Sequence, residues 1–145
     1  MISASEVEII HNILIEKFGG AKGIRDLGLL ESALARPFAT FNEIDLYPTP
    51  VKKAAAIMES IVINHPFIDG NGRTSRLIMN LILLQYGFPL AIIGGDYNSR
   101  MAYYDALEKV QTDNNKKDFI LLIAEKVLFA LERYINILSP ERIRP

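Results

Sequence analysis

The side chains that could do chemistry gather in one run of nine residues, from His65 to Arg73. His65 ends a predicted helix, and an imidazole is the side chain most often used as a general base at neutral pH. Asp69 offers a hard oxygen ligand, of the kind that Mg²⁺ takes when phosphates supply its other ligands. One short loop therefore combines a proton acceptor with a metal ligand.

The second half of the run favours the binding of an anion. Gly70, Asn71 and Gly72 can turn successive N–H groups to one side, which makes a nest for a phosphate. A helix that starts here adds the positive end of its dipole. Arg73 and Arg76 lie one turn apart on that helix, so they share a face and can both reach a polyphosphate.

Each fragment of the run also has an ordinary structural interpretation. A His-Pro-Phe sequence can stop a helix and pack an aromatic ring, and Asp-Gly-Asn-Gly is a common turn. Two arginines on one face can simply be solvated. These roles explain the fragments singly, but not their combination directly before an apolar helix, which favours a phosphate site.

Hydrophobic periodicity and turn residues predict an all-α chain around this loop. The predicted helices span residues 5–18, 29–36, 51–64, 72–86, 98–112 and 118–138. Asn98 or Ser99 is the predicted N-cap of the fifth. The stretch 40–47 alternates weakly, which predicts a small hairpin or an extended flap.

Two helices carry more specific expectations. The first has an apolar stripe of Ile9, Ile10, Ile13, Leu14 and Phe18. His11 lies near the polar edge of this stripe, as either a solvated or a core-satisfied histidine. Helix 72–86 is apolar nearly all round, which is typical of a core helix. With no repeat or linker, residues 1–145 are predicted to form a single domain.

Composition excludes several classes of protein. The chain has 145 residues, half of them hydrophobic, which is enough for a core without staples. It has no cysteine, so disulfides and thiolate zinc sites are excluded. A net charge of −1 argues against a general nucleic-acid surface. We expect neither a signal peptide nor a membrane span, and therefore a cytoplasmic location.

The run from His65 to Arg76 resembles the signature of the Fic family, His-Pro-Phe-x-(Asp/Glu)-Gly-Asn-Gly-Arg-x-x-Arg, and matches every fixed position. The N-terminal part is similar to the Doc (death-on-curing) branch, through Phe18-Gly19-Gly20, Gly23-Ile24-Arg25-Asp26 and residues 28–34. Residues 98–123 look more like the common Fic core. The resemblance implies a Fic-fold helical bundle with a small β-hairpin flap before the signature helix.

The resemblance also implies a reaction, the transfer of AMP from ATP to a Ser, Thr or Tyr hydroxyl of a target protein. By this likeness His65 is the catalytic base and Asp69 holds Mg²⁺. The backbone of Gly70, Asn71 and Gly72 then cradles phosphate, while Arg73 and Arg76 hold the β- and γ-groups. The implied flap, whose target-docking residues are Asn42, Glu43, Ile44 and Asp45, pairs with the target.

Two alternatives stay open. A Doc-like protein kinase toxin would transfer the γ-phosphate, although Doc signatures usually have Lys where this chain has Gly72. A non-catalytic nucleotide-binding Fic module would be expected to have lost His65, Asp69 or Arg73, all of which are present.

Regulation and assembly complete the expectations. Many Fic proteins carry an inhibitory Ser/Thr-x-x-x-Glu-(Gly/Asn) motif, and no glutamate in this sequence fits it. Either a separate small antitoxin supplies the inhibition or none is needed, and we favour the antitoxin as a partner beside ATP and a target protein. A homodimer through the apolar stripe of helix 118–138 stays open. Neither nucleic acid nor a membrane is expected as a partner.

Overall fold

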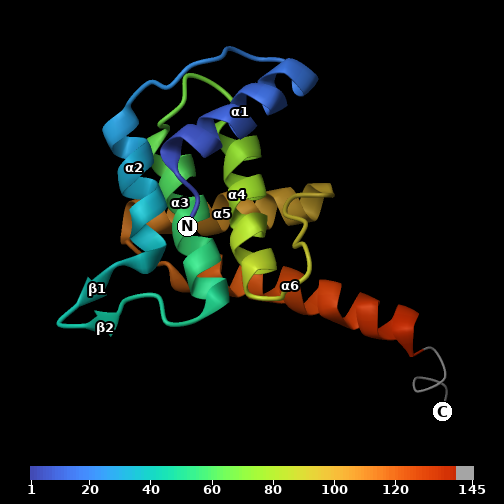
Figure 1. Cartoon of the computed structure of the whole chain (residues 1–145). Coiled ribbons are helices and arrows are strands. Elements are labelled where there is room, and N and C mark those ends of the chain that lie inside the picture. Colours follow the sequence, from blue (N-terminus) through green and yellow to red (C-terminus); the bar gives the residue numbers. More distant parts are fainter. Residues whose placement is uncertain (140–145) are drawn as a thin grey trace. The chain divides into compact units, whose positions relative to one another are not determined.

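The computed structural model describes residues 1–139 and divides into two compact units, residues 1–82 and the part from Leu83 onward (Figure 1). Each unit is described by itself. The single domain predicted for residues 1–145 stays a prediction, and its residues 140–145 lie outside the described part.

The first unit contains four helices, a short 3₁₀ turn and one hairpin, the last helix running on into the second unit. These elements are α1 (Ala4–Phe18), α2 (Leu27–Ala35), η1 (Arg36–Phe38), β1 (Thr40–Phe41), β2 (Ile44–Asp45), α3 (Pro50–Asn64) and α4 (Asn71–Gln85). The second unit continues with α5 (Tyr97–Asp113) and α6 (Lys117–Leu138). The predicted all-α fold with a small hairpin before the signature helix is therefore confirmed.

The helices begin where the sequence offers a capping side chain. Ser3 and Glu6 form a reciprocal capping box at the start of α1. Asp26 accepts a hydrogen bond from the backbone of α2, and Thr49 does the same for α3, directly before Pro50. A side-chain oxygen at these positions satisfies backbone N–H groups that the helix itself leaves without acceptors.

Two predicted details of these helices are wrong. Helix α2 begins at Leu27, earlier than predicted, because Asp26 caps it. Helix α5 is capped by Asp96, whose carboxylate accepts from Ser99, so neither Asn98 nor Ser99 is the cap.

The face that α1 buries also differs from the prediction. Ile9, Ile13 and Phe18 are 61%, 56% and 62% exposed, whereas the buried stripe consists of Val7, His11 and Ile15. The two faces lie side by side on the helix, and the sequence pattern favoured the one with more isoleucines. The buried face is rotated by about one residue from the predicted face. The pattern missed it because a periodicity argument counts histidine as polar and so leaves out His11.

The core of the first unit forms where α2 packs on α3 and the motif loop closes over them. Its large buried side chains are Val7, Ile15, Leu30, Leu34, Ile57, Met58, Ile61, Phe67, Ile78 and Met79. On α4, Leu77 and Leu84 are exposed, so the prediction that this helix is buried all round is wrong.

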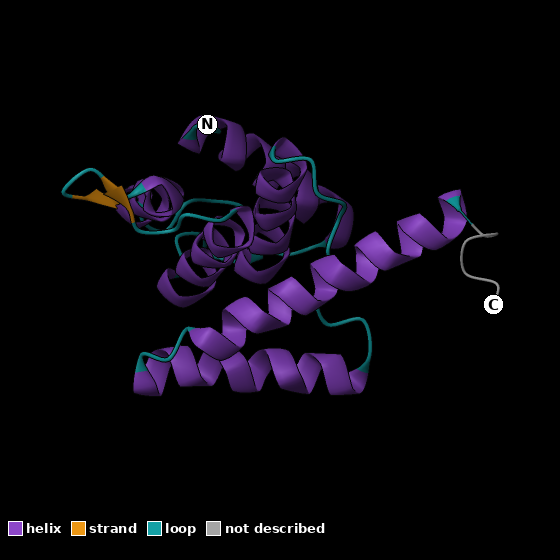
Figure 2. Cartoon of the chain, turned by 90° about the horizontal axis from the view of Figure 1, so that it is seen from below, coloured by secondary structure: helices purple, strands orange, loops and turns teal. Residues whose placement is uncertain are grey.

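In the second unit α5 and α6 pack against each other, with α6 the longer of the two (Figure 2). Tyr103 is buried there and its ring lies 6.2 Å from that of Phe119, while Tyr104 is 53% exposed. Among the described residues, no helix combines the length and the apolar character that crossing a bilayer requires.

Candidate active site

His65 lies at the bend between α3 and α4, both green in Figure 1. It is the C-cap of α3 and has φ 49° and ψ 59°, the left-handed conformation. For a residue with a Cβ this conformation costs about 1–2 kcal/mol, so surrounding contacts must hold it. The bend turns the chain out of α3 and brings the imidazole to the surface beside the motif loop.

The contacts of the imidazole favour one tautomer. Nδ1 lies 3.2 Å from the backbone oxygen of Ile63. A carbonyl oxygen can only accept, so the neutral ring carries its proton on Nδ1 and donates it there. The lone pair is then on Nε2, and His65 is exposed to solvent. This is the arrangement that a general base requires.

Asp69 is held as an ionised carboxylate. Its Oδ1 accepts from the N–H of Gly70 at 2.7 Å and its Oδ2 from the N–H of Ala21 at 3.2 Å. These two hydrogen bonds, with the charge of Arg73 as a smaller cause, lower the pKa of Asp69 below its usual value. An exposed, ionised oxygen donor fits Mg²⁺ that is shared with phosphates.

No group of three His, Asp or Glu side chains that could hold a metal occurs within residues 1–139. The only metal ligand predicted from the sequence is Asp69. A magnesium ion bound there would therefore take its remaining ligands from water and from phosphate oxygens, as is common for this ion.

The loop after His65 is closed by its own side chains. Asn71 accepts from the N–H of Phe67 and donates to the oxygen of the same residue, both at 3.0 Å. This buried amide fixes the start of α4, where the first N–H groups have no acceptor within the helix. The predicted phosphate nest thus has a rigid frame, to which Asn71 contributes its side chain as well as its backbone.

Glycine is required at position 70. Its φ is 74°, and a Cβ there would lie 2.9 Å from Cδ1 of Ile15 and 3.3 Å from Cε1 of His11. Any other residue would be strained at this positive φ and would also displace the side chain of Ile15. Gly72 is less confined, since the atom nearest to an added Cβ would be Nη1 of Arg76 at 3.4 Å.

The two arginine heads lie against different parts of the loop. The guanidinium of Arg76 lies over Gly72, since its Nη1 would be 3.4 Å from a Cβ built on that glycine. Arg73 instead donates from Nη2 to the oxygen of Gly19 at 2.8 Å. The structure therefore brings both predicted cations to the motif, and it gives Arg73 a partner in the N-terminal loop.

The loop from Gly19 to Asp26 is the part of the site that the sequence analysis missed. It contacts Arg73 through Gly19 and Asp69 through Ala21, and Arg25 donates to the backbone at the end of α3. A Cβ on Gly20 would lie 2.6 Å from Oδ2 of Asp69. The signal was available, because three glycines in five residues indicate close backbone approach.

His11 lies directly beneath the motif loop. Its buried ring stacks on Phe67 with centroids 3.9 Å apart, and Nδ1 lies 2.9 Å from Oγ1 of Thr74 on α4. Burial first, and then the charge of Arg73, lowers the pKa of His11. Of its two expected states the solvated one is wrong. The ring is buried and only half satisfied, because Nδ1 bonds Thr74 whereas Nε2 has no hydrogen-bond partner among residues 1–139.

The predicted flap is present as the hairpin β1–β2, with Thr40 paired to Asp45 and Phe41 to Ile44. Asp45 is anchored, because its Oδ2 accepts from Lys53 of α3 at 2.7 Å. This bond lowers the pKa of Asp45. Phe41 and Ile44 are 68% and 69% exposed, so the flap presents apolar side chains and an unpaired strand edge to solvent.

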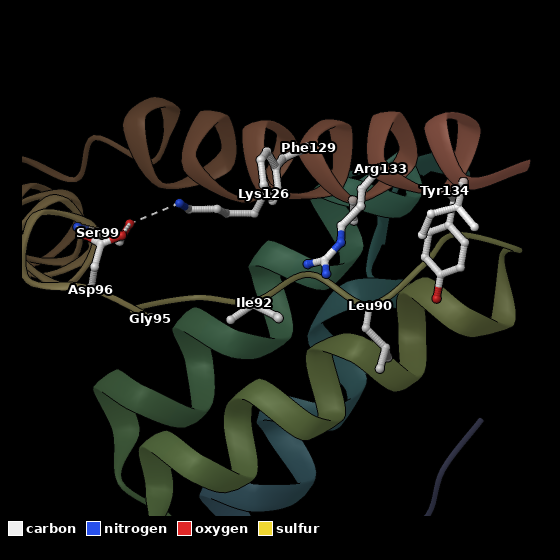
Figure 3. Close-up of a pocket in the computed structure, with 11 residues that line it drawn as sticks. Leu90, Ile92, Gly95, Asp96, Ser99, Lys126, Phe129, Arg133 and Tyr134 are labelled. Atoms are coloured by element: carbon white, nitrogen blue, oxygen red, sulfur yellow. Dashed lines mark hydrogen bonds between the residues drawn. The ribbon is translucent and has the colours of Figure 1, made fainter. Parts of the chain in front are cut away.

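The second unit has a groove of its own, of about 650 Å³, between the loop around Ile92 and α6 (Figure 3). Arg133 and Tyr134 project from α6 over the loop, and Lys126 donates to Ser99 at 3.1 Å. None of the predicted site residues lines this groove.

Comparisons with known proteins identify the family of the chain. The model of the Fic/DOC family matches residues 1–83, which contain the whole candidate site. The toxin Doc of Mycolicibacterium smegmatis is 50% identical over 58 residues, which is 40% of this chain and 45% of that protein. The protein adenylyltransferase Fic of Drosophila persimilis is 37% identical over 113 residues, 78% of this chain and 21% of the fly protein.

A solved structure of a Fic-1 variant fragment from Caenorhabditis elegans matches with a TM-score of 0.79 and 26% identity, over 96% of this chain and 44% of that one. In each of these three matches the chain spans less than half of the relative's own length. The fold, the extent of the family match and the helix-capping histidine beside an arginine-flanked glycine turn lead to one conclusion, that this chain belongs to the Fic/DOC family.

Proposed function

We propose that this chain is a protein adenylyltransferase, which transfers AMP from ATP to a Ser, Thr or Tyr hydroxyl of a target protein. The observation that carries the proposal is the lone pair on Nε2 of an exposed His65, next to an ionised Asp69 and two arginines at one helix start. Relatives named protein adenylyltransferases, 36–42% identical, support it.

In the proposed reaction Nε2 of His65 takes the proton of the target hydroxyl. The hydroxyl oxygen then forms a bond to the α-phosphorus, and the bond to the bridging oxygen breaks, so that pyrophosphate leaves. The first N–H groups of α4, at Asn71 and Gly72, would hold phosphate oxygens, since a helix start attracts anions. Arg73 and Arg76 would hold the β- and γ-phosphates with their fixed charge.

Asp69 would hold Mg²⁺, which would supply positive charge to neutralise the charge that develops on the leaving group. The protein's own contribution to the proposed reaction is positioning and charge stabilisation of this kind, beside the proton transfer to His65.

A second candidate function is a Doc-like kinase that transfers the γ-phosphate. The 50% identity to toxin Doc favours it, as do the contacts that the Doc-like loop makes with Asp69 and Arg73. A glycine at position 72 favours adenylyl transfer, because it leaves room for a phosphate close to the backbone.

The proposed partners follow from the same likeness. The exposed hairpin, with Asn42 and Glu43 at its tip and Ile44 and Asp45 in its second strand, would dock an extended segment of the target. A separate small antitoxin would supply the inhibition for which the sequence holds no motif. We propose a cytoplasmic location, and self-association stays a question for solution measurement.

One experiment separates these functions. The protein is incubated with cell lysate, Mg²⁺ and ATP labelled at either the α- or the γ-phosphate. We expect label to move from the α-position and to require His65 and Mg²⁺. Movement from the γ-position alone would establish the kinase, and movement from neither, with His65→Ala acting in cells as wild type does, would establish a binding module.

A further inference from the structure

The bend at His65 is held from outside by the N-terminal loop. The guanidinium of Arg25 donates from Nε to the oxygen of His65 at 2.7 Å and from Nη2 to the oxygen of Asn64 at 2.6 Å. Both acceptors belong to the end of α3, where carbonyl oxygens lack partners within the helix. One forked cation therefore binds the two carbonyls on either side of the left-handed turn.

The backbone of the same loop forms hydrogen bonds with the next residues of the motif. The N–H groups of Arg25 and Asp26 both donate to the oxygen of Pro66, at 2.7 and 3.1 Å, and Ile68 donates to the oxygen of Gly23 at 3.1 Å. Ile24 and Phe67 form an antiparallel bridge. The loop thus runs antiparallel beside residues 66–68 through one isolated bridge and three backbone hydrogen bonds.

We propose that Arg25 is a positioning residue for the reaction, which holds His65 in its left-handed conformation and so aims the imidazole at the target hydroxyl. The effect on catalysis rests on the function proposed above, whereas the effect on the imidazole does not. A role for this arginine as a surface ion pair is disfavoured, because its guanidinium is directed at carbonyl oxygens rather than at a carboxylate.

The fork of arginine suits this task better than other side chains. Its donors lie in one plane at a fixed spacing, so it can bind two carbonyls at once, and its positive charge complements the negative end of α3. Asp26 fixes the support itself, because its carboxylate caps α2 through Leu29 at 3.0 Å. The chain thus ties the bend at His65 to the start of α2, which packs on α3.

Removing Arg25 should change the orientation of His65 more than the binding of nucleotide. The predicted nucleotide ligands Asp69 and Arg73 are held by Ala21 and Gly19, which Arg25 does not contact. Arg25 is exposed, so its loss should leave the fold intact. The expected signature is therefore a lower kcat at an unchanged KM for ATP.

The test compares Arg25→Ala and Arg25→Lys with Lys22→Ala as the matched control. Lys22 is a cation of the same exposed loop, but it pairs with Glu16 and does not contact the motif. We expect kcat to fall about tenfold to a hundredfold in Arg25→Ala, because small displacements of a base cost that much. Lysine should restore part of the rate, since one ammonium reaches one carbonyl well, and Lys22→Ala should match wild type.

A second readout needs no activity. ¹⁵N-detected NMR of the His65 imidazole reports which ring nitrogen carries the proton. We expect the Nδ1–H tautomer in wild type and in Lys22→Ala, and a mixture of tautomers or broadened signals in Arg25→Ala. Wild-type imidazole signals in Arg25→Ala would overturn the proposal. If the wild-type protein transfers no AMP, the proposed function fails, but this spectrum still decides the role of Arg25.

Discussion

Two bends of the first unit hold residues other than glycine in the left-handed conformation, and they do so for different reasons. At the tip of the hairpin, Asn42 and Glu43 have φ of 49° and 64°. At the end of α3, His65 has φ 49°. The backbone conformation is nearly the same, but the forces that maintain it act over different distances along the chain.

At the hairpin tip, residues adjacent in the sequence impose the left-handed conformation. A two-residue turn between antiparallel strands needs positive φ at both central residues, because only then does its twist match that of the strands. The pairing of Phe41 with Ile44 imposes this geometry within four residues. Asn42 tolerates it well, whereas Glu43 is a less favourable residue for it.

At His65, contacts with residues far away in the sequence hold the left-handed conformation. Its supports come from Arg25 and the backbone of residues 23–26, which are about 40 positions earlier in the sequence. Left-handed strain that remote contacts sustain is typical of functional sites. The difference teaches that similar φ values can mark a turn in one place and a residue held by distant contacts, here the proposed general base, in another.

The largest expected effect comes from a substitution at the bend that holds His65. His65→Ala removes the proposed general base, and we expect the transfer of label from ATP to fall about 10²–10⁴-fold. The measurement is the initial rate with α-labelled ATP, with circular dichroism as a check that the helices remain. Unchanged transfer would show that another group takes the proton.

In the loop from Gly19 to Asp26, nucleotide affinity should be sensitive to substitution of Gly20 but not of its neighbour Gly19. Gly20→Ala places a Cβ 2.6 Å from Oδ2 of Asp69 and 3.2 Å from Nη2 of Arg73, so nucleotide affinity should fall clearly. Gly19→Ala is the matched control, because its φ is also positive but no atom lies within 4 Å of the new Cβ. It should show only the backbone cost, about 1–2 kcal/mol of stability.

Isothermal titration with ATP and Mg²⁺, together with urea unfolding, separates these two effects. Equal losses of affinity in the two variants would mean that the backbone strain, and not the contact with Asp69 and Arg73, is responsible.

A pH titration tests the packing beneath the motif. The pKa of His11 is lowered by burial in the fold, while in the unfolded chain it is near 6.5. Above that pH both states hold a neutral ring. As the pH falls below about 6.5 the unfolded state takes up the proton first, so the free energy of unfolding should decrease.

The measurement is urea unfolding at pH 7.5 and pH 5.5 in wild type and in His11→Phe. Other groups titrate in both proteins, so the difference between them isolates His11, and the variant should lose less stability on acidification. A larger loss in the variant would contradict the burial of a neutral ring.

The smallest expected effect comes from the local bend. Glu43→Gly removes a side chain from a left-handed position, and we expect about 0.5–1 kcal/mol of stabilisation at most, because glycine also gains freedom in the unfolded chain. Asn42→Gly should change stability less, since asparagine already tolerates this conformation. Thermal unfolding of both variants gives the answer, and a larger gain for Asn42→Gly would contradict the comparison of the two bends.

Much of the fold and the site could be predicted because it depends on neighbours in the sequence. Helix periodicity located the six helices of the described residues, and the alternation at 40–47 predicted the hairpin. His65, Asp69 and Arg73 lie in one short run, so their proximity followed from the spacing alone. The errors fell where side-chain capping or a distant contact decides, as with Asp26 at the start of α2 or His11 turning inward on α1.

The sequence by itself determined the chemistry available at the loop, because the types and order of residues from His65 to Arg76 are properties of a local segment. Only the tertiary structure decided how those groups are held. Arg25, Gly19 and Ala21 reach the motif across 40 to 54 residues of chain. These hydrogen bonds join segments far apart in the sequence, so the glycines at 19, 20 and 23 could indicate a close backbone approach but not which residues they meet.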